Sequence, residues 1–131
     1  MKYVAAFFAI IVVILVLDLL WLKLVMGGAF KTELGDIALE APRLTPAAMF
    51  YVMYAVGVLV FVAIPTASSP WHTALGLGAL FGLMAYGTYD LTNMATLKPW
   101  TWKLAGMDMA WGTLVTAVSA VAGRRVVLMF A

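Results

Sequence analysis

The sequence contains no cysteine, one histidine and few charged residues, which make up 11% of its 131 residues. Without cysteine, disulfides and thiolate metal sites are excluded. The single histidine, His72, lies far along the chain from any acidic residue that could share a metal with it. The formal charge is only +2, and the basic residues are scattered. We therefore expect no metal ion, no cofactor and no nucleic-acid partner.

Apolar residues are abundant instead: 66% of the chain is hydrophobic, and the mean hydropathy is +1.06. A soluble domain of this size keeps much of its surface in water, so it could not bury so many apolar side chains. Lipid must therefore be the solvent for most of the surface. The chain is also too short for several domains, so we predict one integral membrane domain covering residues 1–131.

Four apolar segments are long enough to cross a membrane, which takes about 20 helical residues. The sequence therefore predicts an all-α fold, a polytopic membrane protein with an up-down bundle of four transmembrane helices. The first segment resembles a signal peptide, but its length and Asp18 favour a retained helix. The connection between the first two spans predicts a short interfacial helix, because Phe30, Leu34, Ile37 and Leu39 recur at near-helical spacing. The expected spans cover residues 3–25, 47–67, 72–97 and 103–122.

Glycine is concentrated in the first half of the third span, "ALGLGALFGLMAYG". Small residues let helix backbones approach closely, which is how helices associate in lipid. This pattern predicts that the third helix is central in the bundle and that Gly82 lies in a close helix contact.

Three aspartates lie inside the predicted spans. Asp18 and Asp90 are near the C-terminal ends of the first and third spans, and Asp108 is near the start of the fourth. In an up-down bundle these ends share one side of the membrane, which places each carboxyl roughly 5–12 Å in from its helix end. An ionised carboxyl in hydrocarbon is costly, so we expect all three to face the bundle interior. Lys23 and Lys98 lie near enough in sequence to extend toward them.

Aromatic and amide side chains occur at the same depth as the aspartates. They offer hydrogen-bond donors and flat apolar walls, which suit a molecule with a polar head and an apolar body. The pattern Asp-x-x-Trp occurs twice, as "DLLW" at 18–21 and "DMAW" at 108–111. The flanking residues differ, so we interpret the recurrence as chance. The candidate ligand-binding residues are Trp21, Tyr51, Tyr54, Tyr86, Tyr89, Asn93 and Trp111.

Three functions fit this pattern. The leading hypothesis is binding, with or without modification, of a membrane lipid or another amphiphile. Acid–base chemistry would then fall to Asp90, Asp18 and Asp108, with Asp90 favoured because its helix is the most polar. A proton-coupled transporter is the second hypothesis and would require a homodimer. The third is a non-catalytic membrane subunit whose aspartates only tie helices together. Whether the chain is an enzyme stays open.

Several longer sequence motifs resemble those of a known family. The strings "AYGTYDLTNMATLKPW" and "MDMAWGT", together with "DLLWL" and "FYVMYAVGVLVFVAIP", resemble the DUF2177 family of small bacterial membrane proteins over nearly the whole chain. The resemblance implies a four-helix layout and the bacterial inner membrane. The family is one of unknown function, so it implies no catalytic residue. Its association with lipid-modifying genes points toward a lipid substrate.

Positive charge favours a cytoplasmic location for the side that carries the aspartates. The opposite side has only Lys2, Arg124 and Arg125. The basic residues on the aspartate side are Lys23, Lys31, Arg43, Lys98 and Lys103.

Overall fold

A computed structural model of the chain describes residues 1–35 and 43–130. Within these ranges the regular structure is entirely helical. Two long helices each continue into a short π-helical segment, labelled η. The elements are α1 (Lys2–Trp21), η1 (Leu22–Met26), α2 (Gly27–Leu34), α3 (Leu44–Val58), η3 (Leu59–Ala63), α4 (Trp71–Thr96) and α5 (Trp102–Met129).

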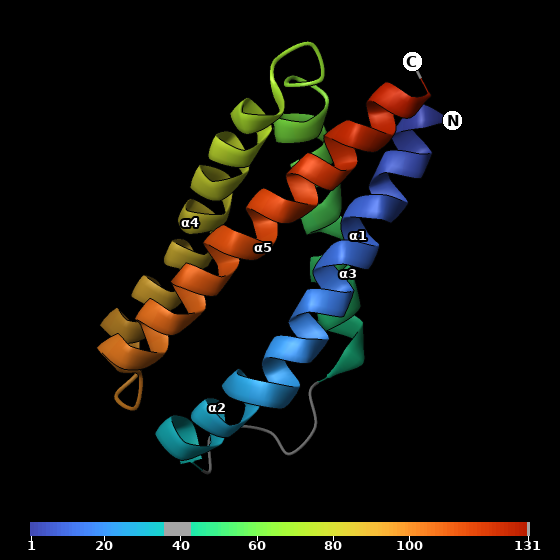
Figure 1. Cartoon of the computed structure of the whole chain (residues 1–131). Coiled ribbons are helices and arrows are strands. Elements are labelled where there is room, and N and C mark those ends of the chain that lie inside the picture. The colour runs from blue at the N-terminus through green and yellow to red at the C-terminus, as the bar shows by residue number, and fades with distance from the viewer. Residues whose placement is uncertain (36–42, 131) are drawn as a thin grey trace.

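The four long helices run up and down in chain order (Figure 1). Both termini lie at one end of the molecule, and α2 and the α4–α5 turn lie at the other. This arrangement confirms the predicted all-α, four-helix order. The short helix expected between the first two spans is present as α2, whereas Ile37 and Leu39 fall outside the described residues.

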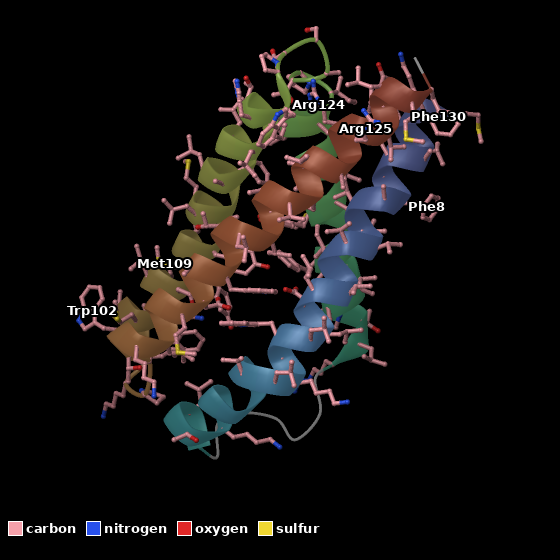
Figure 2. The ribbon with its side chains drawn as sticks, viewed as in Figure 1. Phe8, Trp102, Met109, Arg124, Arg125 and Phe130 are labelled. Carbon is pink, nitrogen blue, oxygen red and sulfur yellow. The ribbon has the colours of Figure 1, made fainter. Side chains whose placement is uncertain are left out.

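Three helices are long and apolar enough to cross a membrane: Lys2–Val25, Leu44–Ala63 and Trp102–Met129. Helix α4 is also long enough, at 26 residues, but the polar residues of "YGTYDLTN" leave it at the edge of the required hydropathy. Apolar side chains on the outer surface face away from the helices, as Phe8 and Trp102 do (Figure 2). The structure is therefore that of a polytopic membrane protein.

Helix α5 extends beyond the expected end near residue 122 and includes both arginines of "GRR". Within this extension, the Nε of Arg124 donates to the carbonyl of Thr66 at 3.1 Å, and its Nη2 donates to the carbonyl of Ser69. These carbonyls belong to the turn between η3 and α4, toward which Arg124 extends (Figure 2). Arg125 is exposed. Arg124 alone thus joins the last part of α5 to a neighbouring turn.

The central helix is α5, and the prediction that the third span is central was wrong. Helix α5 packs along both α4 and α1 and also contacts α2, α3 and η3. The glycines of α4 indicate a close contact but not how many partners a helix has. Helix α5 has several partners because it buries side chains on more than one face, among them Leu104, Val115 and Val127.

The closest contact between α4 and α5 is built from small residues. Gly78 and Gly82 on α4 face Gly112, Thr116 and Ala120 on α5. A Cβ atom at Gly82 would lie 2.6 Å from Thr116 Oγ1 and would meet the carbonyl of Gly112. Glycine is therefore needed at residue 82 for the two backbones to approach, as the sequence predicts.

Helices α1 and α5 lie close together near the termini and diverge toward the α2 end (Figure 1). At the narrow end Gly123 allows the approach, because a Cβ there would lie 2.5 Å from Ile10 Cδ1 and 3.3 Å from Ala63 Cβ. At the wide end bulky aromatic side chains, among them Trp21 and Trp111, lie between the same helices. The size of the side chains thus sets the spacing of the helices.

Gly82→Leu should lower the stability of the protein by about 1–3 kcal/mol, because a larger side chain overfills the α4–α5 contact. Gly76→Leu is the matched control on the same helix, since a Cβ at Gly76 meets nothing within 4 Å. Thermal unfolding in detergent measures both. Equal unfolding temperatures for the two variants would show that residue 82 tolerates bulk.

Candidate functional site

A cavity of about 290 Å³ lies between the helices where they diverge. It is close to the lower end of the range for small-molecule sites, roughly 300–1,000 Å³. All four long helices and η1 contribute to its wall. The lining residues are Asp18, Trp21, Leu22, Phe50, Tyr51, Ala85, Tyr86, Tyr89, Asp108 and Trp111.

Asp18 joins three helices at this cavity. The hydroxyl of Tyr51 on α3 donates to Asp18 Oδ2 at 2.7 Å. The indole Nε1 of Trp111 on α5 donates to Asp18 Oδ1 at 2.9 Å. Asp18 is only 8% exposed, so these two donors replace the water that the carboxyl loses on burial. Both oxygens of Asp18 are therefore already engaged.

The two Asp-x-x-Trp sequences, interpreted above as a chance recurrence, meet at the cavity. Trp21 and Trp111 stack with their ring centroids 4.6 Å apart and an interplanar angle of 3°. The two indole N–H groups differ in their hydrogen bonding. Trp111 donates to the Asp18 carboxyl, whereas the Nε1 of Trp21 is buried and has no hydrogen-bond partner among the described residues. The recurrence therefore has a structural role that the sequence did not reveal.

Asp108 and Asp90 lie beside each other, on α5 and α4. Asp108 is 8% exposed, lines the cavity and lies within hydrogen-bonding reach of the Asp90 carboxyl. Among the described residues, no Tyr or Trp donates to Asp108 as Tyr51 donates to Asp18. Asp90 is fully buried. Its carboxyl lies beside both Asp108 and Trp100. The expectation that all three aspartates are buried in the interior is confirmed.

Three predicted site residues lie outside the cavity wall. Asp90 neighbours Asp108 but does not line the cavity. Tyr54 is buried deeper, and its hydroxyl shares a 2.6 Å hydrogen bond with Thr116 Oγ1. Asn93 lies beside Tyr89 and is half-buried. The other predicted residues are brought together around one space.

Sequence reasoning missed three lining residues, Leu22, Phe50 and Ala85. All three are apolar and so resemble lipid-facing residues of any membrane helix. Their only signal is position, because each directly adjoins a predicted site residue: Trp21, Tyr51 or Tyr86.

The cavity has acidic side chains but no basic ones. No Lys or Arg among the described residues lines it. Lys23 and Lys98, expected to extend toward the aspartates, are exposed, and within the described ranges no ion pair joins either to a carboxyl. Over the same ranges, no group of three or more His, Asp or Glu side chains is arranged to hold a metal ion. The described part of the protein thus places no basic side chain beside the carboxyls of the cavity wall.

These features define a small polytopic membrane protein with a polar and aromatic cavity between its helices. Residues 3–125 match a family described as "Predicted membrane protein (DUF2177)". The match covers nearly the whole chain, and the chain belongs to this family. No curated protein and no solved structure matches the chain. The protein is therefore an integral membrane protein, and its function must be argued from the cavity.

Tyr51→Phe should lower stability by on the order of 1–3 kcal/mol, because it leaves one oxygen of a buried carboxyl without its donor. Tyr3→Phe is the control, since Tyr3 is 45% exposed. Thermal unfolding of both variants in one detergent gives the comparison. If Tyr51→Phe unfolds at the wild-type temperature, the Tyr51–Asp18 bond does not hold α3 to α1.

Proposed function

We propose that the protein binds a membrane amphiphile, a lipid or a molecule of similar character, in the cavity. The observation that supports this proposal most directly is that the cavity wall contains both polar and apolar side chains. Asp18 and Asp108 provide polar groups at a depth where the surrounding solvent is lipid, and Leu22, Phe50 and Ala85 provide apolar surface. A ligand with a polar head and an apolar body matches both parts.

Exposure of the wall supports access from the membrane. Leu22 and Phe50 are each 40% exposed, and Tyr89 is 51% exposed, although all three line the cavity. The cavity therefore has partly open sides formed by apolar and aromatic groups. An acyl or alkyl chain can leave the cavity past these side chains while its head stays inside.

The energetics of Asp108 also favour a ligand. A polar group facing a cavity inside a membrane is costly unless water or a ligand satisfies it. Among the described residues, no Tyr or Trp donates to Asp108 as Tyr51 and Trp111 donate to Asp18, so the head of a ligand would supply this interaction. A scaffold with a purely structural role has no need of such a space between its aspartates.

Binding is favoured over a chemical step or transport. Acid–base catalysis uses positioned proton donors and acceptors at the substrate, yet Asp90 does not reach the cavity and Asp18 is engaged by two donors. Toward the termini, the hydroxyl of Thr66 donates to the carbonyl of Val62 in η3, and the hydroxyl of Ser119 donates to the carbonyl of Thr116 in α5. These groups do not extend the cavity toward the other side of the membrane.

The family resemblance supports the inner membrane of a bacterium as the location. We propose this compartment together with the binding function, since an amphiphile dissolved in that membrane has direct access to the exposed side of the cavity.

Ala85→Phe tests the proposal because it fills the cavity without altering an aspartate. The wild-type protein, purified in a neutral detergent and extracted for mass spectrometry, should retain an amphiphile in stoichiometric amount. Ala85→Phe should lose most of it, whereas Ala95→Phe, at an exposed residue of the same helix, should retain it. Equal retention by all three proteins would mean that the lipid binds elsewhere and would contradict the proposal.

A further inference from the structure

We infer that the head of the ligand is cationic, an ammonium or quaternary ammonium group held beside Asp108 and enclosed by aromatic rings. This inference rests on the proposed binding function and adds the chemical class of the ligand.

The charge of the wall is the first argument. Two carboxyls line the cavity and no described Lys or Arg does. A third carboxyl, that of Asp90, lies beside Asp108. A cation next to Asp108 would favour the ionised form of this carboxyl. It would also be strongly attracted to the carboxylate, because lipid screens charge poorly.

The state of Asp108 is the second argument. Its side chain is more than nine-tenths buried, it faces the cavity, and its contact with Asp90 supplies no positive partner. Asp18, by contrast, accepts from both Tyr51 and Trp111. Asp18 therefore positions the aromatic wall, and Asp108 is the carboxyl left for the ligand.

The aromatic wall is the third argument. Six rings line the cavity: those of Trp21, Phe50, Tyr51, Tyr86, Tyr89 and Trp111. The faces of aromatic rings attract cations, most strongly where water is excluded, and aromatic enclosures are the common means of recognising quaternary ammonium groups. A carboxylate and several rings together form such an enclosure.

An anionic or zwitterionic head fits less well. A phosphate group needs Arg, Lys or several N–H donors, and the cavity wall has no described basic residue. The Tyr51 hydroxyl and the Trp111 indole N–H are already used by Asp18. A phosphate would meet two carboxyls instead, so the inference is for a head with net positive charge.

Four probes with the same alkyl chain test the inference on the purified full chain in a neutral detergent. They are dodecyltrimethylammonium, dodecylphosphocholine, dodecyl phosphate and dodecanol, titrated and counted by native mass spectrometry. The ammonium probe should bind about tenfold more tightly than the other three. Asp108→Asn should reduce its affinity to that of dodecanol, while Asp108→Glu, which keeps the charge, should keep the preference even if Asp108→Asn folds poorly.

The outcomes separate this inference from the proposed function. If dodecanol binds as tightly as the ammonium probe and Ala85→Phe abolishes the binding of both probes, the cavity binds amphiphiles but does not select a cationic head. An Asp108→Asn protein that folds and still prefers the ammonium probe would also overturn the inference. If no probe binds the wild-type protein, the binding function and the cationic head are both wrong.

Discussion

The arrangement of the helices depends on the hydrogen bonds that one buried carboxyl, that of Asp18, accepts. Asp18 lies in a helix whose surroundings are lipid, where no water can replace a missing hydrogen bond. Tyr51 and Trp111 supply both donors, at 2.7 and 2.9 Å. These bonds fix α3 and α5 against α1 and hold the Trp111 ring flat against Trp21. The wall of the cavity is thus a consequence of satisfying Asp18.

The cavity also follows from an uneven distribution of side-chain size along α5. Gly123 lets α1 come close near the termini, and Gly112 gives room to the ring of Tyr86 on α4. The indole of Trp111, one residue before Gly112, is too large for such a close helix contact. It lies between α1 and α5, stacked on Trp21. Close packing at one end and stacked rings at the other leave the helices diverging around a space with polar groups on its wall.

The order of the helices and the depth of the aspartates could be predicted from the sequence, because hydropathy and helix length depend on local composition alone. The role of each aspartate could not. Asp90 and Tyr86 are one turn apart and share a helix stripe, yet Tyr86 lines the cavity and Asp90 does not, although Asp90 neighbours Asp108. Which side of a helix meets a cavity is decided by how neighbouring helices cross it, and one sequence contains no such information.

The other differences between the predicted and the observed structure have the same cause, because they also depend on how the helices pack. The glycines of α4 predicted a close contact, and Gly82 makes one, but they could not show that α5 has more neighbours. The two Asp-x-x-Trp sequences are far apart in the chain, so only the fold reveals that Trp21 and Trp111 stack. Apolar lining residues such as Phe50 carry no sign that they border a ligand site rather than lipid.

The most direct test is to locate the cation itself. Crystals grown from a lipid phase with dodecyltrimethylarsonium would place an anomalously scattering arsenic at the position of the ammonium nitrogen. We predict an arsenic peak inside the cavity, in contact with the Asp108 carboxyl and the surrounding rings. Arsenic found only on the outer, lipid-facing surface, with the space between Asp18 and Asp108 filled by side chains, would contradict it.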